Sequence, residues 1–157
     1  MADGIEDAAW TVVAAPPIEL YIGLSAWRDA QLERHWLLVA RAYGARTATW
    51  IHAANRPELS ITNLSQYLDV SPGHAFDSPD VTDLHLIARL DASCAYDLRA
   101  AADAVPLCNS RDWVLRVLEW LEAAGVIALG LARLWLRHID RLERRLDADD
   151  DDESDAN

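Results

Sequence analysis

The spacing of apolar residues changes near residue 92, and this change constrains the fold more than any other feature. Before it, several segments of strand length are rich in β-branched and aromatic residues or alternate apolar with polar residues. After it, apolar residues recur every three to four positions, as in amphipathic helices. Strands followed by helices predict an α+β fold, in which a small antiparallel sheet is packed by two or three C-terminal helices.

The strand region divides at its prolines and polar runs. Strands are predicted over 10–15 and 18–24, on either side of a Pro-Pro pair, and a further strand over 84–91. Residues 55–83 are rich in Pro, Ser, Asp and Asn, so we predict mostly loop there, with a short strand near 59–63.

Three helices are predicted in the last third of the chain. An alanine-rich helix begins at residue 92 and ends near Pro106, a second runs from about 110 to Gly125, and a third covers 128–146. The third helix is amphipathic, and we expect it to pack on the domain or on a partner. Its polar face carries arginines, as in helices that lie on membranes, so membrane contact is the alternative, which the acidic segment that follows does not favour.

The distribution of charge divides the chain into three parts. Residues 147–157 hold seven acids and no base, and they predict a disordered, solvated tail, with binding to a basic partner as the alternative. Residues 1–9 predict a flexible leader. Residues 10–146 are long enough for one domain with its own core.

Composition excludes several classes of function. The net charge of −12 argues against nucleic-acid binding, and no apolar run approaches the roughly 20 residues of a transmembrane segment. The two cysteines form no disulfide framework, and the N-terminus has no basic region of a signal peptide, so we predict a cytoplasmic protein. No cofactor is predicted. The strand-region histidines show no tight ligand spacing, so a metal site is only an alternative.

Two of these histidines are predicted to meet. Gly44 separates two strand-like segments, 35–43 and 45–54, which predict a β-hairpin. His35 begins one strand and His52 lies near the end of the other, and in an antiparallel hairpin these positions are neighbours. A nucleophile at a helix N-terminus, facing such a pair, has the geometry of covalent acyl chemistry. Ser110 begins the helix after the strands and is the candidate.

The stretches HWLLVARAYGARTATWIHAANRP and NSRDWVLRVLEWL, in this order, resemble the lecithin:retinol acyltransferase group. This group includes small thiol enzymes that act on phospholipids, with a circularly permuted papain-like fold. The resemblance spans residues 18–125. It implies that His35 is the base, that His52 is the second histidine, and that Ser110 stands where the group has its catalytic cysteine. It also implies a site lined by Trp36, Asn109 and Trp113.

The missing cysteine separates the function hypotheses. A helix N-terminus and a histidine lower the pKa of a thiol, whereas a serine hydroxyl gains little from them. Cys108 lies before the helix and is not expected to replace the nucleophile. We therefore predict a catalytically degenerate domain that binds a small molecule, an acyl group or a protein in the residual cleft.

Two alternatives remain. One is a serine acyl hydrolase or transferase that uses Ser110 and His35. The other is an α+β interaction protein with no inherited site. In that case Ser110 is only the N-cap of its helix.

Overall fold

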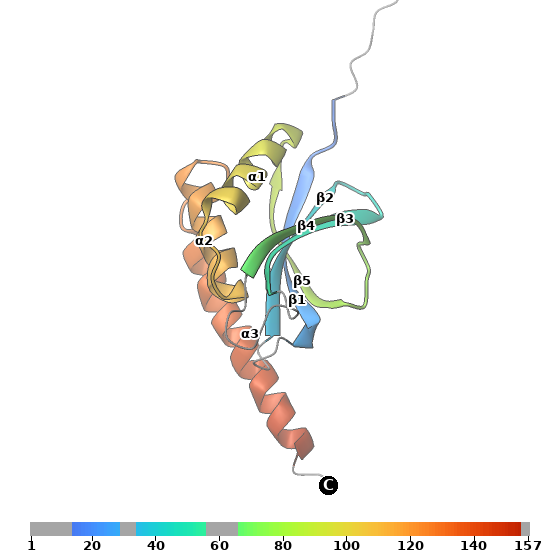
Figure 1. Cartoon of the computed structure of the whole chain (residues 1–157), viewed down its shortest axis with the longest axis vertical. Coiled ribbons are helices and arrows are strands. Elements are labelled where there is room, and N and C mark those ends of the chain that lie inside the picture. Colours follow the sequence, from blue (N-terminus) through green and yellow to red (C-terminus); the bar gives the residue numbers. More distant parts are fainter. Residues whose placement is uncertain (1–13, 29–33, 56–65, 155–157) are drawn as a thin grey trace, which may run out of the picture.

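The fold is α+β, as predicted (Figure 1). A computed structural model describes residues 14–28, 34–55 and 66–154. Five antiparallel strands form one sheet in the order β4-β3-β2-β1-β5, and the helices follow in the chain. The strands are β1 (Ile18–Arg28), β2 (Arg34–Ala42), β3 (Thr47–Asn55), β4 (Gln66–Ala75) and β5 (Val81–Leu90). The helices are the short 3₁₀ helix η1 (Ala92–Cys94), α1 (Ala95–Ala104), α2 (Ser110–Ala123) and α3 (Leu131–Ser154).

Strand β4 was not predicted, because it lies in a segment assigned mostly to loop. Among the described strands it pairs with β3 alone, at the edge of the sheet, and none of its side chains is fully buried. Edge strands tolerate proline, and β4 contains Pro72 and Gly73 near its end. The strand predicted over 59–63 lies outside the described residues, as does most of the one over 10–15. Strand β1 continues to Arg28, beyond its predicted end.

The main core lies between one face of the sheet and the helices. Alternate residues of β1 (Leu20, Ile22 and Leu24) point to this face and are fully buried. In α2 the buried residues recur at helical spacing and supply the other half of the core. They are Trp113, Val114, Leu115, Val117, Leu118 and Leu121.

The opposite face of the sheet carries a second, smaller apolar cluster. Tyr21, Val39 and Trp50 belong to it, and Phe76 and Val81 pack against it from either end of the β4–β5 connection. This connection joins opposite edges of the sheet, which in a flat five-stranded sheet lie about 19 Å apart. It has only five residues and contains tight turns. The sheet must therefore curl around the second cluster.

Helix α3 is longer than predicted. It begins at Leu131 and runs to Ser154, so it continues for eight residues into the acidic segment that was predicted to be disordered from residue 147. Among the described residues, no helix is both long and apolar enough to cross a membrane.

Candidate functional site

Strands β2 and β3 separate near one end of the sheet, and the two predicted histidines lie there. The β2–β3 ladder ends at the pair Leu38–Ile51, although both strands continue beyond it. In this region His35 Nε2 and His52 Nδ1 lie 2.7 Å apart. Both side chains are buried, at 5% and 6% exposure. The prediction that the imidazoles meet is confirmed.

A third polar residue, Asp69, extends this contact. The β3–β4 register pairs His52 with Asp69, and His52 Nε2 lies 3.1 Å from Asp69 Oδ2. The other carboxylate oxygen accepts a hydrogen bond of 2.7 Å from Ser71. Three neighbouring strands thus supply one residue each to a hydrogen-bonded row, Asp69–His52–His35, which we call the histidine relay. No sequence signal pointed to Asp69, because β4 was assigned to loop.

The carboxylate of Asp69 restricts which nitrogen of His52 carries its proton. An ionised carboxylate only accepts hydrogen bonds, so His52 carries its proton on Nε2 and donates to Asp69. A neutral His52 then accepts at Nδ1, and His35 must donate to it from Nε2. The relay therefore orients the ring of His35 through its Nε2 atom.

Burial keeps His52 neutral at ordinary pH. Removal from water lowers the pKa of His52 below its usual value, and the charge of nearby His74 acts in the same direction. The carboxylate of Asp69 acts the other way but does not outweigh the burial. The neutral state agrees with the hydrogen-bond pattern of the relay.

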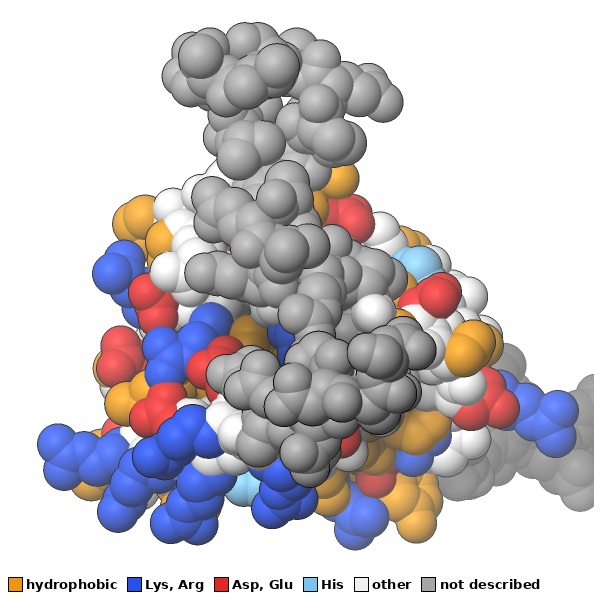
Figure 2. Space-filling view, turned by 90° about the horizontal axis from the view of Figure 1, so that it is seen from below, with side chains coloured by type: hydrophobic (Ala, Val, Ile, Leu, Met, Phe, Trp, Pro, Cys, Tyr) orange, Lys and Arg blue, Asp and Glu red, His pale blue; other side chains and the backbone are white. Residues whose placement is uncertain are grey.

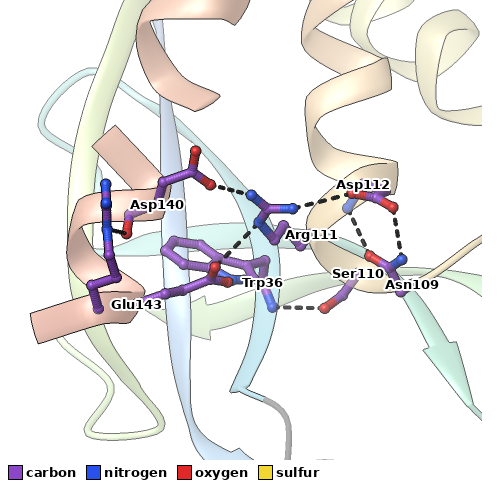
Figure 3. A network of polar contacts seen from close by, with 8 residues as sticks. Trp36, Asn109, Ser110, Arg111, Asp112, Asp140 and Glu143 are labelled. Atoms are coloured by element: carbon purple, nitrogen blue, oxygen red, sulfur yellow. Dashed lines mark hydrogen bonds and ion pairs between the residues drawn. The ribbon is translucent and has the colours of Figure 1, made fainter. Parts of the chain in front are cut away.

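Ser110 lies against the backbone of β2, next to the relay. Its Oγ accepts a hydrogen bond of 3.0 Å from the amide of Trp36, the residue that follows His35 (Figure 3). Ser110 is the first residue of α2 but not its cap. The cap is Asn109, whose side chain accepts from the amide of Asp112. The N-cap alternative for Ser110 is therefore wrong.

Cys108 does not offer a replacement nucleophile. Burial raises the pKa of its thiol, and the carboxylate of Asp112 adds to this effect against an opposing effect of Arg116 that is smaller than that of burial. A thiol with a raised pKa is mostly protonated at neutral pH and a weak nucleophile.

The residues predicted to line the site have other surroundings. Trp36 and Trp113 are both 0% exposed, and their side chains belong to the main core. Asn109 is at the surface, where its side chain accepts from Asp112 and also donates to its carboxylate. The other two strand-region histidines lie elsewhere: His74 stacks on Trp50, and His85 contacts α3. In the parts of the chain that are described, no three potential ligands gather as for a metal ion.

Helix α3 is anchored beside this region through α2 and β2. Arg111, which follows Ser110, forms ion pairs with Asp140 and, at 3.2 Å, with Glu143 of α3. The indole of Trp36 donates to the same Glu143 at 2.9 Å (Figure 3). The start of α2, the start of β2 and the middle of α3 are therefore joined into one polar network around Ser110.

Comparisons with protein-family models, with curated proteins and with solved structures returned no match.

Proposed function

We propose that this chain is a catalytically degenerate relative of the acyltransferase-like, permuted papain-like domains, and that it binds a small acyl-bearing ligand beside the histidine relay. The observation that carries the proposal is the row Asp69–His52–His35, which ends next to the helix start that bears Ser110.

The relay has the parts that acyl chemistry uses. A base works when a second polar group fixes its orientation and tautomer, and a third group can support the second. Here His52 orients His35, and Asp69 orients His52. Burying two imidazoles is costly unless their nitrogens are paired, and these are paired with each other. The paired imidazoles therefore fit a site that evolved to transfer protons better than they fit a purely structural role in packing.

The environment of Ser110 supports binding without turnover. Its oxygen already accepts from the amide of Trp36, so one lone pair is engaged in holding α2 to β2. The field at a helix N-terminus stabilises a thiolate strongly, but a serine hydroxyl remains protonated there at neutral pH. The nucleophile that such a site needs is therefore weak in this chain.

The orientation of His35 by His52 favours a second candidate function, a serine acyl hydrolase or transferase. His35 is oriented by His52, which is what a general base toward a hydroxyl requires. In that case Ser110 is the nucleophile.

A restored thiol tests both candidates. The background is Cys94→Ser/Cys108→Ser, because both native cysteines are free. Ser110→Cys, the same variant with His35→Ala, and Ala95→Cys are compared by their rates with iodoacetamide and with an activated ester. Ala95 is the matched control, because it is exposed and is also the first residue of a helix, but it lacks a histidine relay. Wild type is treated with a fluorophosphonate probe.

The proposal predicts that wild type is inert and that the introduced thiol of Ser110→Cys reacts at least about tenfold faster at neutral pH than the introduced thiol of Ala95→Cys. This excess should be lost when His35→Ala is added. Labelling of wild type at Ser110 that requires His35 would instead establish the serine enzyme. If the thiols of Ser110→Cys and Ala95→Cys react at equal rates and wild type is inert, both candidate functions are contradicted. That result would favour an α+β interaction protein with no inherited site.

A further inference from the structure

The charges of α3 run against its helix dipole. The first turn of a helix favours acids and the last turn favours bases, because of the partial charges at the two ends. In α3 the first turn has no acid and the last turn has no base. Up to residue 145 the five arginines of α3 outnumber its two acids, and the acidic run from residue 147 continues the same helix to Ser154. An isolated helix gains nothing from this order.

Four arginines form a stripe along the exposed face of α3. Arg133, Arg137, Arg141 and Arg145 follow each other at intervals of four residues, which we call the arginine stripe. All four are exposed, and none has a hydrogen bond or ion pair with another described residue. Like charges at this spacing repel each other and destabilise a helix. The stripe is therefore an unfavourable arrangement that an acidic partner would relieve.

The surface at the stripe is hollowed and partly apolar. A pocket of about 280 Å³ is lined by Arg137, Arg141, His138, Leu134 and Trp135. Leu134 is 55% exposed. Arginine side chains gather along one side of the molecule, with hydrophobic side chains between them (Figure 2). Such a mixture of guanidinium groups and apolar surface suits a partner that brings carboxylates on a folded element.

The acidic segment of the same chain cannot reach most of this stripe. Along a continuous helix each residue advances about 1.5 Å, so position 149 lies about 18 Å from position 137. Only Arg145, the last member of the stripe, has an acidic position of this segment within one turn. The acidic segment of a second copy has no such restriction.

We infer that two copies of this chain associate through antiparallel α3 helices, with the acidic segment 147–154 of each copy lying along the arginine stripe of the other. In the antiparallel arrangement the two helix dipoles point in opposite directions, which is favourable. The contact is symmetric, so the arginine stripe of each copy meets the acidic segment of the other. It uses surfaces that the proposed ligand site does not include.

Sedimentation velocity of the full chain at low and high salt tests the inference. Two variants each remove one side of the contact: Arg133→Glu/Arg137→Glu/Arg141→Glu reverses the stripe, and Asp149→Arg/Asp150→Arg/Asp151→Arg/Asp152→Arg reverses the acidic segment. A third variant combines all seven changes and restores complementarity with opposite signs. Arg116→Glu, an exposed arginine of α2, is the control, and circular dichroism verifies that each variant is folded.

The expected result is a dimer at low salt whose affinity falls at least about tenfold at high salt, because exposed charges are screened. Each half-reversed variant is expected to be monomeric, while the combined variant and Arg116→Glu dimerise like wild type. A monomeric wild type at low salt would overturn the inference, as would a dimer that the half-reversed variants leave intact. Binding of wild type to anionic lipid vesicles through the stripe, without self-association, would also overturn it.

Discussion

Two adjacent residues at the start of α2 have different structural roles, and substitution separates them. Asn109 caps the helix by accepting from the amide of Asp112, while Ser110 accepts from the amide of Trp36 in β2. We expect Asn109→Ala to lower the free energy of unfolding by about 1 kcal/mol, the usual value of an N-cap. We expect Ser110→Ala to lower it by about 1–3 kcal/mol, because it leaves a partly buried amide without its acceptor.

Urea denaturation of both variants measures these values. Asn109→Asp and Ser110→Thr are the controls, because each retains an oxygen that can accept the same bond. If Ser110→Ala is neutral while Asn109→Ala costs about 1 kcal/mol, the contact between Ser110 and Trp36 does not stabilise the fold.

The sequence predicted the two histidines of the relay but not its third member. Hairpin geometry alone places His35 beside His52, since both belong to segments with clear strand patterns. Asp69 depends on β4, whose polar residues and proline obscure the strand pattern. Its position opposite His52 follows only from the β3–β4 register, and register is fixed by tertiary pairing that no local pattern contains.

Among the elements, β1 and β5 pack closely against each other at a glycine. A Cβ atom at Gly23 would lie 2.9 Å from Cγ1 of Val81, closer than packed atoms allow. We expect Gly23→Ala to lower the free energy of unfolding by about 1–3 kcal/mol, as overpacked substitutions do. In a Val81→Ala background the same change should cost less than half as much, because the clashing methyl group is absent. The double-mutant cycle in urea measures this coupling, and additive effects would contradict the contact.

The attachment of α3 to the rest of the fold depends on Glu143. This carboxylate accepts from the indole of fully buried Trp36 and pairs with Arg111. We expect Glu143→Leu to lower the free energy of unfolding by about 1–3 kcal/mol, since the indole N–H loses its acceptor. Glu143→Gln keeps an acceptor and should cost less than about 1 kcal/mol. Thermal and urea unfolding of the two variants test this order, and equal costs would mean that charge, rather than the indole bond, holds α3.

The ends of the helices and strands could be predicted only where buried apolar residues recur at a regular spacing. The core of α2 was evident from apolar residues at three- and four-residue spacing. The end of α3 was not, because residues 147–154 have no apolar period and their charge is typical of solvated tails. A helix propagates more readily than it starts, so a packed first part can extend into a segment that would not form a helix alone.

At the scale of the whole molecule, two histidines with lowered pKa values lie at separate places in the fold. His52 lies on the face of the smaller cluster, and His138 lies where α3 meets β5. Burial lowers the pKa of both histidines, and for His138 the charges of His85, Arg141 and Arg145 act in the same direction. The stability of the whole fold is therefore linked to proton uptake at two separate places.

This linkage has a definite sign. Unfolded histidines titrate near pH 6.5, and both histidines have a lower pKa in the folded chain. As the pH falls below about 6.5, the unfolded chain binds these protons before the folded chain does. The stabilising contribution is thus fully present above this pH and is lost as the pH falls through the folded pKa values. Each histidine adds a slope of at most about 1.4 kcal/mol per pH unit.

The variant His138→Phe tests one of the two contributions. The Nε2 atom of His138 is buried without a hydrogen-bond partner among the described residues, and its ring meets His85 and Trp135 edge to face. Phenylalanine keeps this ring packing and removes the titration, so we expect unchanged or higher stability at about pH 7.5 and a smaller loss on going to about pH 5.5. Urea denaturation of wild type and His138→Phe at the two pH values measures the difference. A variant whose stability falls with pH as steeply as that of wild type would show that His138 takes up its proton equally in the folded and unfolded chains.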